Sequence, residues 1–441
     1  MDDSVTNTPV MTAGVRHDIA LMPAVIIGGT MNVLSVARGL WSHGVAVDVI
    51  GGPVDSPALW SKSVRNYYRP DGSDTDRQWM DLLVHDLEPS VLLPGSDDAL
   101  EFIVRHRQDL VDLGHRPIEA NDEAILDMLD KSRTYEIARS AGVAAPDTAT
   151  VATTNDLHYL DDFRFPCAVK PVESHVFTRR FQPFAKGARV DSAAEAASLL
   201  EPIVLEGVPM LLTEFVEGSD ECCSYYTYLD ENGDPLFEYT KRKLRVYPTG
   251  FGLGTYHMSE WQPDVAGVGL RFCRAAKLRG IANVEFKRDS RDGQLRLIEC
   301  NARFTNAQEV VRKSGIDMGW LAYTRMTGMP LPAFSRPRDR VGLIFLVEDL
   351  QALMEYRRKG ELSVPQWLRT VAMHQAPPFF DWRDPLPSAM NFLSFARRVC
   401  RHAGRRARGH SSGDVLAADP YTRRDGTSSR FPISAQTEIK G

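Results

Sequence analysis

The segment LIECNARFTN (297–306) restricts the fold of this 441-residue chain more than any other. Glu299, Asn301 and Arg303 occupy every second position, directly after an apolar run. Successive side chains of a β-strand alternate between its two faces, so all three would point the same way. Charged groups that share one side of a half-buried strand need a compensating partner. Two oxygen ligands beside a guanidinium therefore predict a divalent cation that carries phosphate groups.

A second acidic residue, Glu285, lies in the β-rich run before this segment, and the two runs predict a hairpin over 281–304. A three-residue loop at 291–293, with its glycine in the left-handed conformation, would place Glu285 directly opposite Glu299. A two-residue loop would put Glu285 on the other face. We favour the longer loop, which joins Glu285, Glu299 and Asn301 in an oxygen-rich cluster suited to Mg²⁺. An ordinary solvated hairpin face is the alternative that spacing leaves open.

At 441 residues the chain exceeds one ordinary core, which predicts two or three domains. The pattern of strands and helices predicts an α/β and α+β protein. Strand, helix and strand follow one another at 23–29, 30–44 and 45–52, which is the pattern of a parallel sheet. We therefore divide the chain into a mobile leader (1–20), a Rossmann-like parallel-sheet domain (21–120), a central region (121–330), a mixed α/β extension (331–400) and a basic, polar tail of disordered composition (401–441).

Composition excludes several classes of protein. Hydrophobic residues make up 43% and charged residues 25% of the chain, as in soluble globular proteins. A net charge of −6 argues against a dedicated nucleic-acid binder. The six cysteines show no CxxC spacing, which predicts the reduced thiols of an intracellular protein. Because the sequence shows neither a secretory signal nor an apolar run of about 18 residues, the expected location is the cytoplasm.

Five short motifs follow one another along the central part of the chain. They are DK (130–131), AVKP (168–171), TEFVEG (213–218) followed by Glu221, VEF (284–286) and IECNAR (298–303). In this order they resemble the ATP-grasp ligases, and the resemblance spans residues 23–330. Members of that family hold ATP between two α+β lobes and use Mg²⁺ to phosphorylate a carboxylate, which an amine or similar nucleophile then attacks. The resemblance implies a pre-ATP-grasp domain at 21–120 and a two-lobed ATP-grasp domain at 121–330, with a small lobe at 135–213 and a large lobe at 214–330.

The resemblance also assigns nucleotide contacts. Lys170 matches the lysine that grips the α- and β-phosphates, and Lys131 matches an auxiliary phosphate lysine. The segment Glu214-Phe215-Val216 matches the strand whose backbone reads the adenine edge, and Glu221 matches the carboxylate that takes the ribose hydroxyls. A strand lysine facing water and a helix-start charge are the plain alternatives for Lys170 and Lys131.

The same resemblance assigns the metal and the transferred phosphate. Glu285, Glu299 and Asn301 match the Mg²⁺ ligands, with Mn²⁺ as an alternative ion. Arg303 matches the arginine that steadies the γ-phosphate and the reaction intermediate. ATP and Mg²⁺ are accordingly the expected cofactors.

One region departs from the family pattern. Many relatives cover the phosphates with a glycine-rich loop soon after the lysine strand, whereas residues 173–190 contain a single glycine. We therefore expect Arg179, Arg180 or Lys186 to supply cation contacts where backbone N–H groups usually do.

The basic stretch TKRKLRVYPTGFGLGTYHMSE (240–260) resembles the ATP-grasp carboligases related to D-aspartate ligase. Arg242, Lys243 and Arg245 are the cations expected to hold the acid that is activated and its new phosphate. The plain alternative is that these charges only coat a hairpin.

Together these features predict an ATP-dependent ligase that activates a carboxylate as an acyl phosphate and joins it to an amine, with amino acids as the expected substrates. Two other classes stay open. One is a nucleotide-binding regulatory protein that kept the fold and lost turnover. The other is a nicotinamide-dependent enzyme built on the first domain, although VIIGGTMNVLSVARG (25–39) departs from the GxGxxG fingerprint.

The remaining expectations concern partners. We expect no nucleic-acid partner, and a homodimer is the default assembly for a soluble enzyme. The segment 388–410 carries an apolar stripe that runs into six arginines. A basic amphipathic helix of this kind can lie on an anionic membrane. We expect it instead to pack on its own domain, with a solvated tail.

Overall fold

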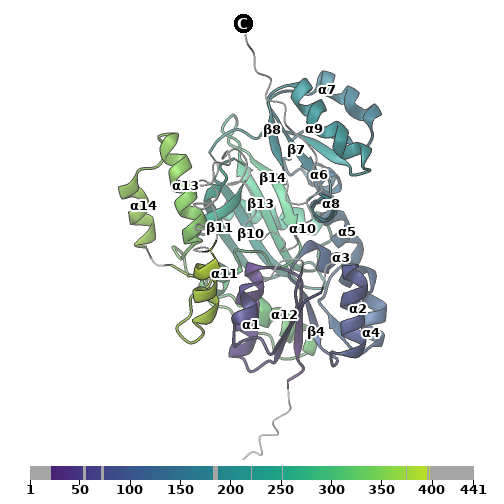
Figure 1. Cartoon of the computed structure of the whole chain (residues 1–441), viewed down its shortest axis with the longest axis vertical. Coiled ribbons are helices and arrows are strands. Elements are labelled where there is room, and N and C mark those ends of the chain that lie inside the picture. The colour runs from purple at the N-terminus through teal and green to yellow at the C-terminus, as the bar shows by residue number, and fades with distance from the viewer. Residues whose placement is uncertain are drawn as a thin grey trace, which may run out of the picture.

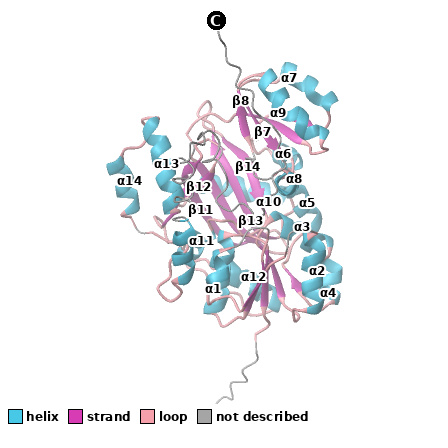
Figure 2. Cartoon of the chain, in the orientation of Figure 1, coloured by secondary structure: helices cyan, strands magenta, loops and turns pink. Residues whose placement is uncertain are grey.

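The computed structural model describes residues 21–52, 56–70, 74–181, 187–219, 221–250, 252–373, 375–394 and 397. Within this part of the chain the strands form three sheets, which Figure 1 shows one above another along the long axis of the molecule. Helices cover the outside of the sheets, and α13 (Leu346–Arg358) and α14 (Val364–Val371) stand apart on one side (Figure 2). The predicted α/β and α+β class is confirmed.

The first sheet is parallel throughout, with strand order β3-β2-β1-β4-β5. Both β1 and β4 are apolar runs that are buried along their whole length, as expected where helices cover both faces. The predicted Rossmann-like sheet is therefore confirmed. Its elements are β1 (Ala24–Ile27), α1 (Met31–Ser42), β2 (Val47–Ile50), η1 (Pro57–Trp60), β3 (Asn66–Tyr68), α2 (Thr75–His85), β4 (Val91–Pro94), α3 (Asp97–Arg105), α4 (Arg107–Asp112) and β5 (Arg116–Pro117).

The second sheet is antiparallel, with strand order β6-β9-β7-β8. Helix α9 (Ala193–Leu205) covers one face, because Ala196, Leu200 and Val204 form one apolar stripe that joins Val169 and Leu212 in a buried cluster. The other elements here are α5 (Asp122–Leu129), α6 (Lys131–Ser140), β6 (Thr148–Val151), η2 (Thr154–His158), α7 (Tyr159–Asp162), β7 (Cys167–Pro171), α8 (Ser174–Arg180), β8 (Ala188–Val190) and β9 (Met210–Glu214).

The third sheet has six antiparallel strands in the order β14-β13-β10-β11-β12-β15. One face packs on α10, where Tyr225, Val284 and Phe286 join Phe272 in a buried cluster. Alternate residues of the same strands must face the opposite way. The elements are β10 (Cys222–Leu229), β11 (Pro235–Tyr247), β12 (Leu253–Ser259), α10 (Pro263–Ala275), β13 (Gly280–Arg288), β14 (Leu295–Asn301), α11 (Gln308–Lys313), α12 (Met318–Thr327) and β15 (Gly342–Ile344).

The hairpin of β13 and β14 pairs Glu285 with Glu299, as predicted. The predicted three-residue loop is wrong, because β13 ends at Arg288 and β14 begins at Leu295. Phe286 pairs with Leu297, so Ile298 is an extra residue, a β-bulge that shifts the register back. The backbone N–H of Leu297 donates to the carbonyl of Ala144 (2.8 Å), which lies outside the hairpin.

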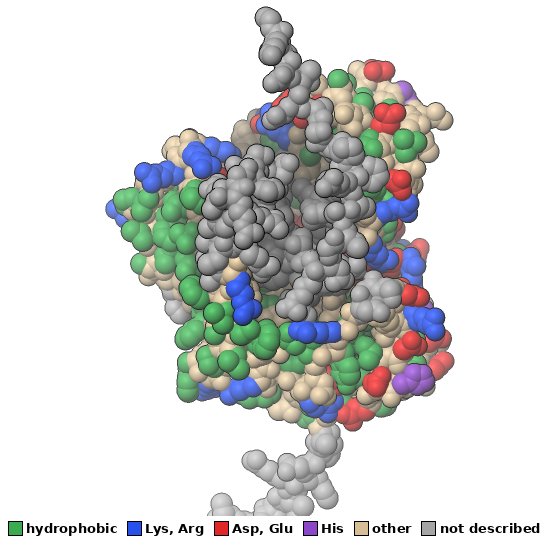
Figure 3. Space-filling model, in the orientation of Figure 1, with side chains coloured by type: hydrophobic (Ala, Val, Ile, Leu, Met, Phe, Trp, Pro, Cys, Tyr) green, Lys and Arg blue, Asp and Glu red, His purple; other side chains and the backbone are tan. Residues whose placement is uncertain are grey.

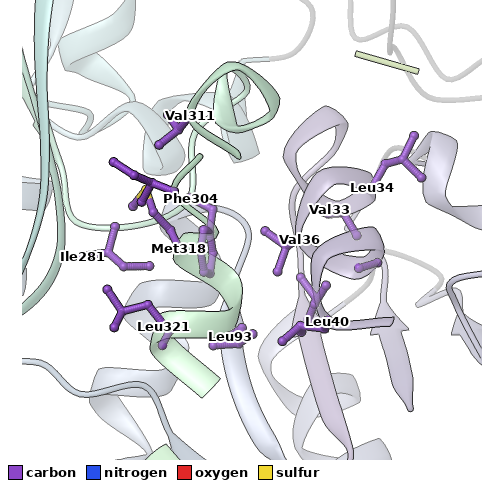
Figure 4. Close-up of a cluster of buried hydrophobic side chains, with 14 of the residues drawn as sticks. Val33, Leu34, Val36, Leu40, Leu93, Ile281, Phe304, Val311, Met318 and Leu321 are labelled. Carbon is purple, nitrogen blue, oxygen red and sulfur yellow. The ribbon is translucent and has the colours of Figure 1, made fainter. Parts of the chain in front are cut away.

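Apolar contacts join the first sheet to the third. Figure 4 shows side chains of α1, among them Val36 and Leu40, directed toward Met318 and Leu321 of α12. Phe304, which follows β14, belongs to the same buried cluster. The side-chain amide of Asn32 donates to the carbonyls of Gly95 (2.8 Å) and Phe304 (2.9 Å). The edge of the first sheet at which β1 and β4 end is thereby fixed against the end of β14.

Two buried carboxylates attach the C-terminal part. Asp349 of α13 accepts hydrogen bonds from Arg245 of β11 (2.9 and 2.8 Å). Asp384 accepts from Arg38 Nε of α1 (3.0 Å). The predicted leader and tail lie outside the described residues. The described cysteines are free thiols, and among the described helices none is both long and apolar enough to cross a bilayer.

Replacing Phe304 by Ala tests the junction between the first and third sheets. Phe304 is fully buried, so we expect the truncation to cost about 3–5 kcal/mol of unfolding free energy. The midpoint of urea unfolding, followed by circular dichroism, measures the loss. Phe380→Ala is the control, because that ring is 56% exposed, and it should leave the midpoint nearly unchanged. Equal midpoints for the two variants would contradict the packing described.

Candidate active site

A row of polar side chains crosses the third sheet on the face away from α10. Register places Glu299 opposite Glu285, Glu285 opposite Ser224, Ser224 opposite Lys241, and Lys241 opposite Ser259. Residues directly opposite one another in a sheet share a face. The row therefore brings charged groups from β14, β13 and β11 to one side.

The two carboxylates at the end of this row are held by neighbouring polar groups. Lys243 Nζ donates to Glu285 Oε1 (2.5 Å), and the side-chain amide of Asn301 donates to Glu299 Oε1 (3.0 Å). Glu285 is only 9% exposed. Burial alone would raise the pKa of Glu285, but the charges of Lys243 and Lys241 outweigh it and hold the pKa below its usual value. Glu285 is thus an anion that depends on nearby cations.

This donor set fits a divalent cation. Two carboxylates directly opposite each other repel unless positive charge lies close by. Lysine ammonium groups supply that charge here, since burial would lower the pKa of Lys243 but negative neighbours, Glu285 among them, raise it above its usual value. Carboxylate and amide oxygens are the ligands that Mg²⁺ prefers. Glu285, Glu299 and Asn301 would hold the ion.

Lys170, on the second sheet, lies close enough to Glu285 and Glu299 for their charges to act on its ammonium. It lies on β7, and burial lowers the pKa of its ammonium while the charge of Glu299 partly offsets this. Lys131, the first residue of α6, donates to Ser174 Oγ (2.7 Å), just beyond the end of β7. The two predicted phosphate lysines thus belong to adjoining segments, and the charges of Glu299 and Glu285 both act on the Lys170 ammonium.

The predicted adenine and ribose residues lie where the second sheet leads into the third. Glu214 accepts hydrogen bonds from Arg291 (2.6 Å) and from the backbone N–H of Asp147 (3.2 Å). Arg189 Cζ and Lys287 Nζ lie over the Phe215 ring, 5.0 and 5.3 Å from its centroid. Val216 is buried. Glu221 is ion-paired with Arg242.

The three basic residues predicted to hold the acid do not lie together. Lys243 forms an ion pair with Glu285. Arg242 is the preceding residue of the same strand, so its side chain points to the opposite face, where it forms ion pairs with Glu221 and with Glu260 (3.3 Å). Arg245 pairs opposite Tyr256 while Lys243 pairs opposite His257, so a β-bulge turns Arg245 to the other face. Its guanidinium binds Asp349 instead. The structure brings only Lys243 to the carboxylates.

Two residues that sequence reasoning missed complete the row. Lys241 Nζ lies 3.1 Å from Ser224 Oγ and 3.2 Å from His257 Nδ1. Burial lowers the pKa of Lys241 to about 8 and that of His257 well below its usual value. Gly254 makes room for this group, because a methyl there would lie 2.3 Å from the His257 ring. The two-residue spacing of Lys241 and Lys243 was the available signal.

Arg303 closes the site toward the first sheet. Its Nε and Nη2 donate to the carboxylate of Asp97 (2.5 and 2.9 Å), which lies in the first turn of α3. The charge of Glu299 also acts on it. Arg303 therefore lies between the acidic pair and the edge of the first sheet, and its contact with phosphate stays a prediction.

The region after β7 folds as helix α8 and attaches to α3. Arg179 donates to Asp98 (2.5 Å) and Glu101 (2.9 Å), and His175 Nε2 lies 3.2 Å from Glu101 Oε2. Arg180 pairs with Glu206 (2.8 Å). The two predicted cations of α8 are therefore engaged with protein carboxylates, and Lys186 lies outside the described residues. The contact with His175 lowers the pKa of Glu101 to about 2, despite its burial.

Comparisons with known proteins find similar proteins by sequence and by fold. No family model matches the chain. D-aspartate ligase of Enterococcus faecium (strain Aus0004) is 23% identical over 360 residues, which cover 76% of this chain and 85% of the relative. The structure of N5-carboxyaminoimidazole ribonucleotide synthetase, solved as an ADP complex, matches with a TM-score of 0.56 and 12% identity over 72% of this chain and 80% of that one.

Two further solved structures are similar to this chain in fold. L-amino acid ligase from Bacillus licheniformis matches with a TM-score of 0.53 and 17% identity, over 69% of this chain and 74% of that one. The biotin carboxylase domain dimer of Hydrogenobacter thermophilus 2-oxoglutarate carboxylase, solved with MgADP, matches with a TM-score of 0.55 and 14% identity, over 73% of each chain.

This chain has the ATP-grasp fold. By sequence it is similar to D-aspartate ligase, and it shares its fold with the two ligase structures named above. The second sheet carries Lys170, and the third sheet carries Glu285 and Glu299.

Glu101→Gln tests the attachment of α8. Because the folded pKa of about 2 lies below the ordinary 4.5, the carboxylate stabilises the fold above pH 4.5 and loses this contribution as the pH falls toward 2. We expect a lower urea midpoint than wild type at neutral pH, and a difference that narrows below pH 4.5. Glu206→Gln, on an exposed pair, is the matched control. A difference that stays constant with pH would contradict the assignment.

Lys243→Met and Arg245→Met test the separation of the two cations. Lys243→Met should lower ATP-dependent ADP release by at least about 100-fold, since a charge beside the reacting phosphate is lost. Arg245→Met should instead lower the unfolding free energy by about 3–5 kcal/mol, because Asp349 is left buried and unpaired. ADP release is measured at a temperature where both variants are folded. If Arg245→Met were folded but lost turnover as completely as Lys243→Met, the separation would be wrong.

Proposed function

We propose that this chain is an ATP-dependent ligase that activates a carboxylate as an acyl phosphate and joins it to an amine, releasing ADP and phosphate. The observation that carries the proposal is the opposition of Glu285 and Glu299 across β13 and β14, close enough to Lys170 of β7 for their charges to act on its ammonium. A metal–triphosphate needs carboxylates to bind the metal and a cation to bind the phosphates. Here the acidic residues lie on one sheet and the lysine lies on another.

The chemistry explains why such charges are gathered. A carboxylate is a poor electrophile, because substitution would have to expel oxide, and phosphorylation supplies a better leaving group. Bound Mg²⁺ would neutralise phosphate oxygens and help align the γ-phosphate with the attacking carboxylate. Lys170 and Lys131 orient the triphosphate, while Lys243 and Arg303 stabilise negative charge as the phosphoryl group is transferred. The amine then displaces phosphate from the acyl phosphate.

Amino acids are the substrate class that we propose. The support comes from the named activities of two relatives, D-aspartate ligase and L-amino acid ligase. The edge at which β1 and β4 end adjoins Arg303 through Asp97, and open parallel sheets bind ligands at such edges. We place one substrate there, next to the γ-phosphate.

The same proposal includes the remaining assignments made from sequence. The boundaries are a Rossmann-like domain at 21–120, a small lobe at 135–213 and a large lobe at 214–330, with Glu214-Phe215-Val216 at adenine and Glu221 at ribose. Mn²⁺ could replace Mg²⁺. We propose a cytoplasmic homodimer, and one structural relative is a dimer of biotin carboxylase domains.

The two competing classes find less support. A nicotinamide enzyme would need the turn after β1 to be open to a pyrophosphate. Methyl groups at Gly28 and Gly29 would lie 2.3 Å from Ser96 Oγ and 2.7 Å from the Gly95 carbonyl, so the turn after β4 fills that space. The second class is a regulatory protein without turnover. The presence of the complete predicted set in one place argues against it, namely Lys170, Lys243, Glu285, Glu299 and Arg303.

Glu299→Gln tests the proposed function. ADP release from MgATP is measured with pairs of amino acids and small carboxylic acids, and product masses are recorded. Wild type should release ADP only with a matched pair and form the condensed product. The variant should lose turnover by at least about 1,000-fold, because a metal ligand is gone, and keep its melting temperature. Turnover by the folded variant at the wild-type rate would overturn the metal assignment. If no pair of substrates stimulated ADP release by wild type, the regulatory alternative would be favoured.

A further inference from the structure

Two glutamates and a histidine meet where α8 contacts α3, outside the row of charges on the third sheet. Glu101 lies on α3, Glu173 directly precedes α8, and His175 is the second residue of α8. One ligand atom of each side chain lies within 4.8 Å of the other two. We call these three residues the Glu-Glu-His cluster. It joins two helices that are far apart in the sequence and lie close together in the fold (Figure 1).

The imidazole of His175 is buried without a hydrogen bond at Nε2. The residue is 4% exposed. Among the residues that the structure describes, none forms a hydrogen bond of acceptable geometry with this nitrogen, although Glu101 Oε2 lies 3.2 Å away. A buried polar atom needs a partner, because leaving it unsatisfied costs free energy. Since Glu173 Oε2 is also only 3.5 Å from Nε2, the missing partner would lie among the three side chains of the cluster.

The distances in the cluster match the spacing of ligands around zinc. Zinc binds histidine nitrogen and carboxylate oxygen at about 2.0–2.2 Å, mostly with tetrahedral geometry, so two of its ligand atoms are about 3.3–3.6 Å apart. His175 Nε2 lies 3.2 and 3.5 Å from the two glutamate oxygens. Mg²⁺ and Ca²⁺ prefer oxygen ligands throughout, so the histidine favours zinc.

The charges around the cluster leave a surplus that a cation can neutralise. Arg179 donates to Glu101 Oε2 (2.9 Å) and to Asp98 Oδ1 (2.5 Å). Arg105 pairs with the other oxygen of Glu101. With Glu173 there are thus three carboxylates against two guanidinium groups. Figure 3 shows acidic and basic side chains intermixed on the side of the molecule where Figure 1 places α3.

The arginines do not block the carboxylate of Glu101. A carboxylate oxygen has two lone pairs, so Oε2 can accept from Arg179 and also bind an ion. Hydrogen bonds of this kind orient a carboxylate that binds a metal. The side chain of Glu173 is 40% exposed, which gives an ion a path into the cluster.

We propose that Glu101, Glu173 and His175 bind a zinc ion that fixes α8 on α3. Water would take the fourth position. The proposed site is separate from the acidic pair of the third sheet. It adjoins one of the predicted phosphate lysines, because Lys131 donates to Ser174 Oγ, between two of the proposed ligands. The competing interpretation is that a proton on His175, rather than a metal, joins the two carboxylates.

The test is zinc binding by the full chain, after treatment with a chelator and dialysis, in buffer that contains Mg²⁺. Competition with a chromophoric chelator measures the affinity, and we expect one zinc ion per chain. Glu173→Gln and His175→Asn should each lower the affinity by at least about 100-fold, because one of three ligands is lost. Co²⁺ in place of zinc should give the visible absorption of a tetrahedral site, which both variants should lack.

Three further variants are controls, and all should bind zinc like wild type. His158→Asn replaces an exposed histidine, and Glu206→Gln replaces an exposed carboxylate that pairs with Arg180 of α8. Glu299→Gln removes a carboxylate of the third sheet, so it shows whether zinc binds there instead. Melting temperatures check that each variant folds. If His175→Asn does not fold, Glu173→Gln decides the question, since that side chain is partly exposed.

Three results would overturn the proposal. One is the absence of zinc binding by wild type, which would leave a proton on His175 as the interpretation. Another is a folded Glu173→Gln variant that binds zinc as tightly as wild type. The third is loss of binding in Glu299→Gln, which would assign the ion to the third sheet. Because the measurement is metal affinity and not ADP release, its outcome does not depend on the ligase assignment.

Discussion

Lys170, Lys243, Glu285 and Glu299 bring charges of both signs close together from two different sheets. Glu285 is nearly buried and remains an anion because ammonium groups are close to it. Lys170 is brought to the same place by a different sheet. Removing one partner from such a group leaves the others charged and poorly solvated, which is costly. A metal–triphosphate, which offers positive and negative charge together, could satisfy both sets at once.

The first sheet also contacts the site, through residues at the edge where its strands end. Its strands end where Asn32 binds the Phe304 carbonyl and where Asp97 binds Arg303. Helix α8, which follows β7 of the second sheet, adds a further link to α3 through Glu101. The region after β7, where the sequence departs from the expected glycine-rich loop, thus begins with a short helix attached to α3. That attachment would couple movement of the second sheet to the edge of the first sheet at which we place one substrate.

Much of the fold and part of the site could be predicted from local patterns. The apolar run of β1 and its helix indicated the parallel sheet, and the alternation of Glu299 and Asn301 indicated one face of a strand. The pairing of Glu285 with Glu299 was predicted correctly for a wrong reason. The loop is longer than expected, and the bulge at Ile298 restores the register. Sequence could not reveal that bulge, because Leu297 takes its partner from Ala144 in another segment.

A second bulge explains why the basic residues were harder to assign. Simple alternation would place Lys241, Lys243 and Arg245 on one face, but the register shift after Lys243 sends Arg245 to Asp349. Lys241 went unnoticed because only the folded sheet shows it opposite Ser224, in line with the acidic pair. Partners such as Asp97 and Asp349 lie in distant segments, and a single sequence does not reveal such pairs.

The central claim is that acidic side chains of β13 and β14 hold divalent cations beside a bound triphosphate. A crystal of the chain grown with Mn²⁺ and a non-hydrolysable ATP analogue would test it through the anomalous scattering of manganese. We predict anomalous peaks within coordination distance of Glu285 and Glu299, with the phosphate chain reaching Lys170. Nucleotide bound elsewhere, or bound here with manganese away from both carboxylates, would contradict the account.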